Sequence, residues 1–413
     1  MISLQEKGAL LVESERKLAV SSTHEKNLAL REVAHSIDHN REEILKANAL
    51  DVENARKSGM KEGLVDRLLL DHGRIDGIIE SLYTVIKLPD PIWKSDRVWT
   101  LENGLTISKM TVPLGVIGIV YESRPNVTVD AFGLALKSGN AILLRGSSTA
   151  IHSNVALVKA IKEGLKKTDI PEGVVEFIDD TDRDLVLQML RSNDFLDLVI
   201  PRGSGALIDF VVKNATVPTL QTGEGNCHVY IDDTANLHDG VKIVVNAKTQ
   251  RVGVCNACET LLVNRKVAKD FLPMAYEALK DKVELRADEE TREIISAKAA
   301  TEEDWATEFL DFILAIKVVE DVDEAIAHIN KYGTKHSESI ITETLGNALK
   351  FQRQVDASTV YVNASTRFTD GGEFGFGAEM GISTQKTHAR GPVGLEQLVT
   401  HKYLVMGQGQ TRK

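Results

Sequence analysis

From Gly115 onward, short apolar runs alternate with stretches of helical periodicity, and this alternation restricts the possible folds more than any other feature of the sequence. Each apolar run has the residue types of a buried strand, and a helical stretch follows it. Strands that alternate with helices form a parallel sheet covered by helices. The runs are GVIGIV, AILL, GVVEFI and LDLVI, and the helical stretches are VTVDAFGLALK, STAIHSNVALVKAIKEGL, DLVLQML and ALIDFVVK.

A second series of the same kind runs from HVYID through ETLLVN, DFILAIKVV, ESIIT and TVYVN. A chain of 413 residues is also too long for one ordinary core. The sequence therefore predicts two α/β lobes. Residues 1–85 are rich in Ala, Leu, Glu and Lys, and Val33, Ala34 and Ile37 recur at helical spacing, which predicts a helical segment before the first lobe.

Residues 93–112 have a different character. Two β-prone runs flank Asn103-Gly104, the strongest short-range signal for a β-hairpin. An isolated two-stranded hairpin is only marginally stable in water. The hairpin is therefore expected either to decorate its own domain or, as we favour, to pair with another chain.

Charge and cysteine content exclude several classes of function. The 60 acidic residues outnumber the 49 basic ones, and the net charge of -11 repels nucleic acids and anionic membranes. No apolar stretch has the length of a membrane span, and the first residues lack the apolar core of a secretory signal. Three cysteines are too few for a disulfide framework, so we expect a cytoplasmic protein.

Two glycine- and serine-containing turns follow predicted strands of the first series. Backbone N-H groups at the start of a helix bind anions, and two such turns on successive strand-helix units favour a dinucleotide site. No G-x-G-x-x-G motif follows the first strand, so the cofactor phosphates are expected to bind differently from those in a typical Rossmann fold. The expected cofactor-binding residues are Gly203, Ser204 and Gly205 in one turn and Arg145, Gly146, Ser147 and Ser148 in the other.

The segment KTQRVGVCNACETLLVN contains Cys255 and Cys258. A zinc site needs a second spaced pair, which Cys227 and His228 do not provide, and we expect no metal. A thioredoxin-like pair opens a helix, whereas ETLLV after Cys258 is strand-like. Cys255 lies in a polar loop after Lys248 and Arg251, a setting that favours a thiolate, while Cys258 resembles a core residue. Spacing alone leaves Cys255 open as a nucleophile or a buried structural thiol.

At this point the sequence resembles the aldehyde dehydrogenase superfamily over nearly the whole chain. The most specific segments are VYESRPNVTVDAFGLALKSGNAILLRG, NAKTQRVGVCNACETLLVN, AIAHINKYGTKHSESIIT and VNASTRFTDGG followed by GISTQKTHARGP. The last two indicate the branch that acts on γ-glutamyl phosphate rather than the superfamily in general.

The resemblance implies roles for individual residues. Cys255 matches the nucleophile, Asn126 the amide donor to the oxyanion, and Glu308 the glutamate that holds the nicotinamide ribose. Arg145 and Ser148 stand where NAD-preferring relatives carry an acidic residue, so the implied cofactor is NADPH/NADP⁺. Gln221 replaces the water-activating glutamate of hydrolytic members. The implied substrate-binding cations are Arg124, Arg251, Arg367 and Arg390, for each of which structural ion pairing is the alternative.

The implied fold is aldehyde dehydrogenase-like, with two Rossmann-like α/β lobes and a β-hairpin oligomerisation arm. The implied domains are an NADPH-binding domain (1–92, 113–226 and 364–395), a catalytic domain (227–363) and an arm (93–112 and 396–413).

The implied activity is the NADPH-dependent reduction of γ-glutamyl phosphate to glutamate 5-semialdehyde, through a Cys255 thioester, in proline biosynthesis. A hydrolytic NAD(P)-dependent aldehyde dehydrogenase is the alternative enzyme. A catalytically silent binding protein with a Cys255-Cys258 redox switch is the alternative of another class. We further expect a homo-oligomer, and an interaction with the upstream glutamate 5-kinase.

Overall fold

Two units make up the chain, and the computed structural model describes residues 2–412. Within these residues, unit 1 consists of 2–221, 375–381 and 393–412, and unit 2 of 222–374 and 382–392. The predicted return to the first domain at residue 364 differs from this division, because 364–374 and 382–392 pack with unit 2. The arrangement of two α/β lobes agrees with the prediction from strand and helix alternation.

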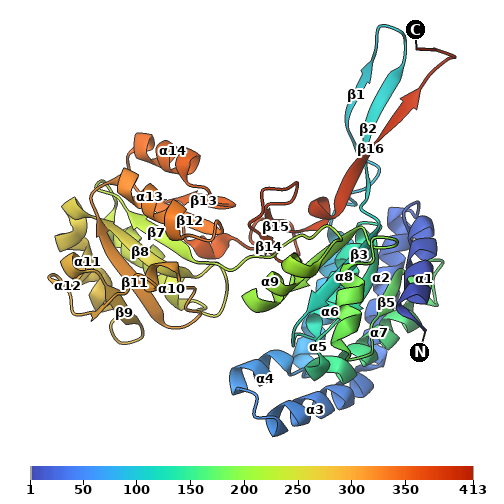
Figure 1. Ribbon diagram of the computed structural model, residues 1–413, viewed down its shortest axis with the longest axis horizontal. Coiled ribbons are helices and arrows are strands. Elements are labelled where there is room, and N and C mark those ends of the chain that lie inside the picture. The colour runs from blue at the N-terminus through green and yellow to red at the C-terminus, as the bar shows by residue number, and fades with distance from the viewer. Residues whose placement is uncertain (1, 413) are drawn as a thin grey trace. The chain divides into compact units, whose positions relative to one another are not determined.

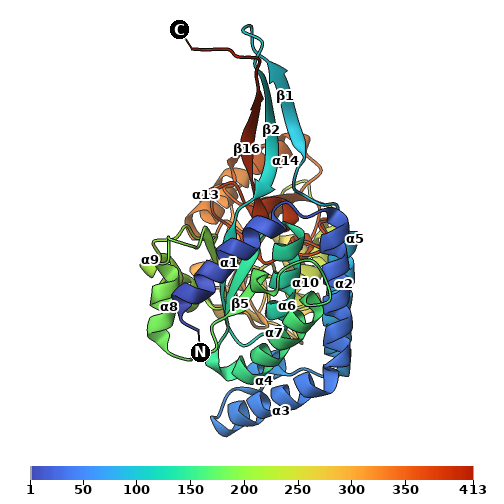
Figure 2. The same ribbon diagram turned by 90° about the vertical axis from the view of Figure 1, so that its right-hand side faces the viewer.

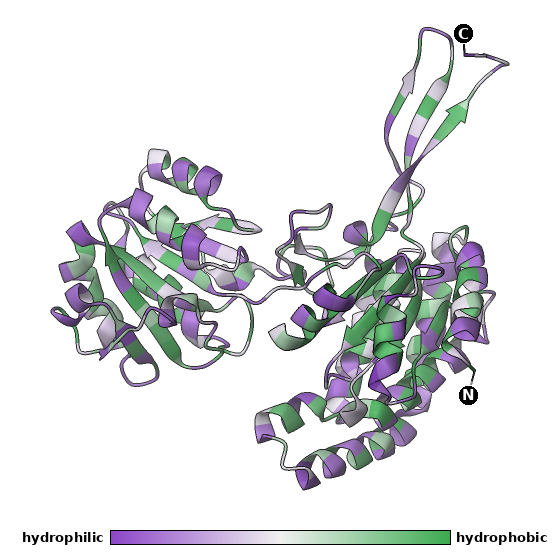
Figure 3. Ribbon diagram, in the orientation of Figure 1, coloured by the Kyte–Doolittle hydropathy of each residue, from purple (hydrophilic) through white to green (hydrophobic). Residues whose placement is uncertain are grey.

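Unit 1 contains a parallel sheet in the order β5-β4-β3-β6. Every position of β3, β4 and β5 is buried, as expected of strands covered on both faces. Figure 3 shows hydrophobic residues concentrated along these strands. The strands are β3 (Val116–Tyr121), β4 (Ala141–Arg145), β5 (Val175–Phe177) and β6 (Leu198–Arg202), and the helices between and after them are α6 (Asn126–Lys137), α7 (Ile151–Leu165), α8 (Arg183–Leu190) and α9 (Gly205–Asn214).

The predicted helical segment before the first lobe forms five helices. Ser3 with Glu6 and Ser22 with Glu25 form capping boxes that start the first two helices. A Cβ on Gly164 of α7 would lie 2.6 Å from the Cα of Val33, so only glycine allows α7 to pack this closely on α2. The helices are α1 (Leu4–Leu18), α2 (Thr23–His39), α3 (Arg41–Lys57), α4 (Glu62–Leu68) and α5 (His72–Lys87).

A three-stranded antiparallel sheet, which we call the arm, consists of β1 (Ser95–Thr100), β2 (Thr106–Pro113) and β16 (Val399–Met406). The hairpin of β1 and β2 turns at Asn103-Gly104 as predicted, and β16 pairs with β2 from Val399↔Pro113 to Met406↔Thr106. Figures 1 and 2 show the arm extending away from the helices of unit 1. The C-terminal strand therefore completes a sheet that the hairpin begins.

Unit 2 is built on a parallel sheet in the order β10-β9-β11-β8-β7-β12-β13. Hydrophobic clusters lie on its two faces, one with helices α10 and α11 and the other with α13 and α14. The strands are β7 (Cys227–Ile231), β8 (Cys258–Asn264), β9 (Glu284–Ala287), β10 (Lys298–Ala299), β11 (Ile313–Val319), β12 (Ser337–Ile341) and β13 (Thr359–Val362), and the helices are α10 (Leu237–Thr249), α11 (Arg265–Leu279), α12 (Glu289–Arg292), α13 (Val322–Tyr332) and α14 (Leu345–Gln354).

The segment 382–392 joins unit 2 through backbone and charge contacts. Its strands β14 (Ile382–Ser383) and β15 (Gly391–Pro392) pair with each other, and the N-H of Gly223 donates to the carbonyl of Ile382 at 3.0 Å. Lys386 and Arg390 both bind Asp356, at 2.8 and 2.9 Å. These contacts explain why this segment leaves the domain that the sequence predicted for it.

Candidate active site

Cys255 lies in the loop between α10 and β8, where it is half-buried, whereas Cys227 and Cys258 are fully buried. The carbonyl of Cys255 is held in place, because the Sγ of Cys227 donates to it at 3.1 Å. A Cβ on Gly225 would lie 1.4 Å from the same oxygen, so position 225 accepts only glycine. The start of β7 therefore fixes the backbone that carries Cys255.

Cys258 is a core residue, as its apolar neighbours predicted. It belongs to the hydrophobic cluster beneath α10 and α11, and its Sγ donates to the carbonyl of Thr260 at 3.3 Å. Burial raises the pKa of the Cys258 thiol to about 12. The cysteine that contacts the Cys255 backbone is Cys227, and this geometry does not favour a Cys255-Cys258 redox switch.

Lys248, which we expected to favour a Cys255 thiolate, has a carboxylate partner of its own. Lys248 is fully buried, and its Nζ lies 2.5 Å from the Glu259 carboxylate, which is also fully buried. Burial raises the pKa of Glu259 and the charge of Lys248 opposes that rise. The lysine charge is thus compensated inside the unit, and sequence proximity to Cys255 did not reveal this partner.

Two of the four predicted arginines lie at the Cys255 loop. The Nε of Arg367, in the 3₁₀ turn Thr366–Phe368, donates to Oε1 of Gln250 at 2.8 Å, and Gln250 directly precedes Arg251. Burial lowers the pKa of Arg367, and the positive charge of Arg251 lowers it further. The charge of the Asp370 carboxylate opposes both effects, and the charge of the Cys255 thiolate does so to a smaller extent. Arg251, Arg367 and Cys255 are therefore electrostatic neighbours.

The other two predicted arginines have different surroundings. Arg390 is paired with Asp356, which also binds Lys386 and Lys335. Lys386 and Arg390 hold the pKa of the Asp356 carboxyl below its usual range. This favours the structural alternative for Arg390. Arg124 belongs to unit 1, where its backbone N-H donates to the carbonyl of Glu122 at 2.6 Å.

Glu308 lies beside the Gly225 segment, because its Oε1 accepts from the N-H of Gly225 at 2.8 Å. Burial raises the pKa of the Glu308 carboxyl; the Gly225 hydrogen bond opposes this and the charge of Glu224 adds to it. The structure thus brings Glu308 to the segment that supports the Cys255 carbonyl. Its role at the nicotinamide ribose stays a prediction.

The turn at the start of α9 is occupied by a side chain that the sequence analysis missed. The carboxylate of Glu122 accepts from the backbone N-H of Ser204 at 2.9 Å and from its hydroxyl at 2.7 Å. The expected anion site at Gly203, Ser204 and Gly205 therefore binds an internal carboxylate. No sequence signal pointed to this contact, since 82 residues separate its partners.

The second turn follows β4 and opens with a 3₁₀ turn, Ser148–Ala150, rather than directly with α7. Arg145 is only 6% exposed, and its guanidinium donates to the carbonyl of Gly146. Its Nε has no hydrogen-bond partner among residues 2–412. Ser148 is exposed. A buried guanidinium nitrogen without a hydrogen-bond partner, next to an exposed serine, is consistent with the predicted phosphate-binding site.

Asn126 begins α6, and its amide donates to Oδ2 of Asp130 at 2.9 Å. The other carboxylate oxygen of Asp130 accepts from the hydroxyl of Ser81 at 2.8 Å. Burial raises the pKa of Asp130, and the hydrogen bonds from Ser81 and Asn126 oppose that rise. Ser81 and Asp130 thus orient the amide, although Asn126 belongs to unit 1 and its pairing with Cys255 stays a prediction.

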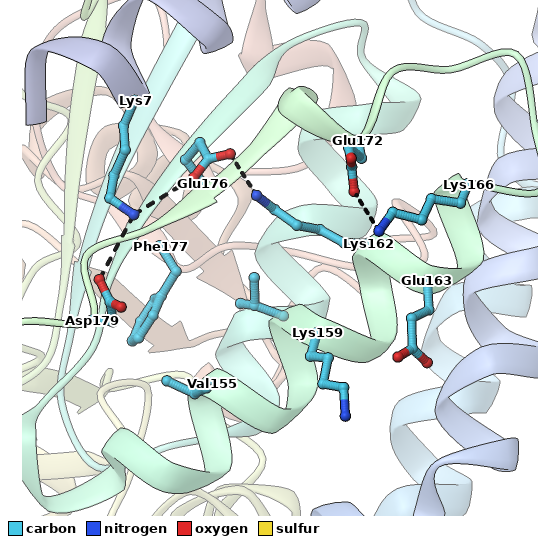
Figure 4. Close-up of a pocket in the computed structure, with 11 residues that line it drawn as sticks. Lys7, Val155, Lys159, Lys162, Glu163, Lys166, Glu172, Glu176, Phe177 and Asp179 are labelled. Carbon is cyan, nitrogen blue, oxygen red and sulfur yellow. Dashed lines mark hydrogen bonds and ion pairs between the residues drawn. The ribbon is translucent and has the colours of Figure 1, made fainter. Parts of the chain in front are cut away.

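A cavity of about 390 Å³ lies elsewhere in unit 1, beside α7 and β5 (Figure 4). Its lysines are neutralised, since Lys162 binds Glu176 at 2.5 Å and Lys166 binds Glu172 at 3.3 Å. It contains no predicted site residue. Across residues 2–412, no helix combines the length and apolar character needed to cross a membrane, and no cluster of His, Cys, Asp or Glu is arranged to hold a metal ion.

Comparisons with known proteins agree on one family. The profile described as "Aldehyde dehydrogenase family" matches residues 12–306 and 294–389. "Gamma-glutamyl phosphate reductase" of Alkaliphilus metalliredigens is 61% identical over 413 residues, all of both chains. The crystal structure of gamma-glutamyl phosphate reductase from Thermotoga maritima is 56% identical, covers all of both chains and has a TM-score of 0.98. An acetylating aldehyde dehydrogenase from Geobacillus thermoglucosidasius, 16% identical with a TM-score of 0.70 over 99% and 97% of the chains, shares the fold.

Proposed function

Because the chain belongs to the aldehyde dehydrogenase family, and within it to the γ-glutamyl phosphate reductases, we propose that it reduces γ-glutamyl phosphate to L-glutamate 5-semialdehyde and releases phosphate. This is the second reaction of proline biosynthesis. The chain is accordingly an oxidoreductase that acts on a small molecule and uses a nicotinamide cofactor.

The observation that best supports this function is the environment of Cys255. It is the one cysteine of the described chain that is not fully buried, its carbonyl is held by Cys227, and Arg251 and Arg367 lie next to its loop. An accessible thiol near positive charge is the arrangement that a cysteine nucleophile requires.

In the proposed reaction, the Cys255 thiolate attacks the acyl carbon of γ-glutamyl phosphate. The carbon-oxygen bond to phosphate breaks, and its electron pair leaves with the phosphate. A thioester remains on Cys255. The Asn126 amide and the Cys255 backbone N-H hold the oxyanion. Hydride addition to the thioester carbon gives a thiohemiacetal, whose collapse returns the electron pair to sulfur and releases the aldehyde.

NADPH, when bound, supplies the hydride. Glu308 provides a carboxylate oxygen for the nicotinamide ribose, and Arg145 and Ser148 provide donors for the 2'-phosphate. Anion binding at the start of α9 requires Glu122 to release the N-H of Ser204, which it now occupies. The preference for NADPH over NADH rests on the Arg145 turn, where no carboxylate forms an ion pair with the arginine in residues 2–412.

Gln221 stands where hydrolytic family members carry a general base, and its neutral amide cannot activate water. We therefore expect the thioester to react with phosphate faster than with water. The test runs the reaction backward, with glutamate 5-semialdehyde and NADP⁺, with and without inorganic phosphate. A general base contributes about 10² to 10⁴-fold, so sustained NADPH formation should require phosphate.

Two alternatives predict other outcomes of this experiment. Full-rate NADPH formation without phosphate, with free glutamate as the product, would establish a hydrolytic dehydrogenase. Bound cofactor without turnover in either condition would establish a silent binding protein. Neither alternative is favoured by the relatives, which are named as reductases over the full chain.

We also propose that the arm pairs with a second copy of this chain. Its outer strands present exposed apolar side chains: Val98, Tyr403, Val405 and Met406, which are 53–73% exposed. An exposed apolar sheet edge is a liability unless a partner covers it. Since the substrate is an acyl phosphate, a kinase must supply it, and delivery by contact with that kinase stays a prediction.

A further inference from the structure

Two arginines next to the nucleophile have no carboxylate partner. Neither Arg251 nor Arg367 forms an ion pair anywhere in residues 2–412, although most buried or half-buried cations of this protein do. Arg367 is half-buried and Arg251 is exposed. The polar contact that orients Arg367 comes from Gln250, a neutral side chain, at 2.8 Å. The Asp370 carboxylate attracts Arg367 without forming an ion pair with it, so neither guanidinium has a directly bound carboxylate among residues 2–412.

The loop that carries Arg367 is fastened to the residue that follows Cys255. The amide of Asn256 donates to the carbonyls of Thr369 at 2.9 Å and Arg367 at 3.3 Å. The hydroxyl of Thr366 donates to the carbonyl of Asn256 at 2.7 Å. These bonds fix the position of the Arg367 loop relative to Cys255, so the guanidinium is held near the thiol by the fold itself.

This arrangement has an energetic cost. Burial lowers the pKa of Arg367 first, and repulsion by Arg251 lowers it further. Like charges near each other destabilise a fold unless something compensates them. Elsewhere this chain provides a carboxylate, as Asp356 does for Arg390. At the Cys255 loop, Asp370 attracts Arg367 but no carboxylate of residues 2–412 forms an ion pair with either guanidinium, so both can bind an external anion.

We propose that Arg251 and Arg367, oriented by Gln250, form the binding site for the phosphoryl group of the acyl phosphate, and that Arg390 has no part in it. This assignment rests on the proposed function. The phosphorus is joined to the attacked carbon by one bridging oxygen, whereas a three-carbon chain separates that carbon from the α-carboxylate. Cations beside Cys255 therefore meet the phosphate. Two guanidiniums also match a dianion in charge, and their forked donors match its oxygens.

The site gives the arginines a role in the chemical step. When the thiolate attacks, the electron pair of the breaking carbon-oxygen bond goes to the phosphate, which leaves as inorganic phosphate after taking up a proton. Negative charge on the leaving oxygen therefore grows during the step. Cations fixed beside that oxygen stabilise the developing charge without having to reorganise.

Protection of Cys255 from alkylation tests the site without any reductase activity. Iodoacetamide, which is neutral, labels Cys255 of the full-length protein at rising concentrations of inorganic phosphate, with ionic strength held constant by chloride. Phosphate should slow labelling in a saturable way. In Arg251→Gln and Arg367→Gln the half-protecting concentration should rise about tenfold or more, as expected for the loss of a charged hydrogen bond. Arg353→Gln, at an exposed position of α14, is the matched control and should not change it.

Unchanged protection in both arginine variants would overturn the proposal, and so would an equal loss in Arg390→Gln. Thermal unfolding shows whether each variant is folded. If Arg367→Gln does not fold, Arg367→Lys is the second variant. It keeps the positive charge but loses the two parallel N-H donors of the guanidinium, and it should still weaken phosphate protection severalfold. Phosphate protection that depends on both arginines, in a protein that makes no NADPH from glutamate 5-semialdehyde, would keep this site and reject the proposed substrate.

Discussion

Cys255 is the half-buried member of a set of three cysteines whose other two members have no exposed surface. Burial raises the pKa of Cys227 and of Cys258 and leaves both as thiols at neutral pH. Only Cys255 combines access with neighbouring cations. Cys227 has a supporting part, because its thiol fixes the carbonyl of Cys255.

Substitution of each cysteine should separate these roles. Cys255→Ala should abolish turnover and leave NADPH binding unchanged, because it removes the covalent step and not the cofactor turns. Cys258→Ala should retain most activity and cost a modest amount of stability. Turnover and NADPH fluorescence titrations measure the two effects. Equal inactivation by both substitutions would contradict a single nucleophile.

Ser148 offers a test of cofactor choice. Because Ser148 is exposed and Arg145 is buried, Ser148→Glu introduces a negative charge near the 2'-phosphate without burying it. The KM for NADPH should rise about tenfold or more, a loss of about 1.4 kcal/mol, with little change for NADH. Ser148→Thr is the uncharged control. A parallel rise in KM for both cofactors would place the 2'-phosphate elsewhere.

The sequence indicated candidate residues for the site but not the side chains that contact them in the structure. Cys255, Asn126, Glu308 and the arginine set come from the family resemblance, which contiguous segments of the chain carry, and their roles stay predictions. The Lys248 pairing and the Glu122 contact at Ser204 could not be found in this way, because each depends on how distant segments pack in three dimensions. The position of a charged residue in the sequence, even close to a nucleophile, does not show which group its charge is paired with in the fold.

At the level of elements, the Lys248–Glu259 pair joins the last turn of α10 to β8. Glu259 also accepts from the backbone N-H of Leu310 at 3.2 Å, which ties in the segment before β11. Breaking a buried ion pair leaves one charge without compensation, whereas replacing both members with apolar residues is often neutral.

Lys248→Met should therefore lower the free energy of unfolding of unit 2 by about 3–5 kcal/mol, and the double variant Lys248→Met/Glu259→Met should recover most of it. Chemical denaturation measures both. The exposed pair Lys242–Asp239 on the same helix is the control, since Lys242→Met should cost less than about 1 kcal/mol. If the double variant is less stable than Lys248→Met, the pair is not what holds α10 to β8.

Most of the strands of the two parallel sheets were predictable from periodicity, and the two that were missed in unit 2 share a physical cause. β10 is the edge strand of the unit 2 sheet and β9 is the strand next to it, and both are short and partly exposed. Their sequences, ELRA and KA, therefore lack the continuous apolar runs that marked β7 and β8. An edge strand is defined by its neighbour more than by its own composition.

At the scale of the whole molecule, the arm should determine assembly. Val405→Asp combined with Met406→Asp places one charge on each face of β16, since successive side chains of a strand point to opposite faces, so whichever face a second copy covers receives a charge. Light scattering should show a smaller species, with NADPH binding retained. Val20→Asp, an exposed apolar position outside the arm, is the matched control. A variant with the same mass as the unmodified protein would show that assembly does not use this surface.

The division of unit 1 into three chain segments has a consequence for biosynthesis. β2 emerges from the ribosome early, yet its partner β16 is translated near the end. The hydrogen bond from the Asn140 amide to the carbonyl of Leu398 likewise cannot form until the last part of the chain has been made. At about 5–20 residues per second, translation from residue 221 to 393 takes roughly ten to thirty seconds. Unit 2 is complete by then, so unit 1 begins to fold first and finishes last. During that interval the β1–β2 hairpin exposes an unpaired strand edge, which is prone to aggregation.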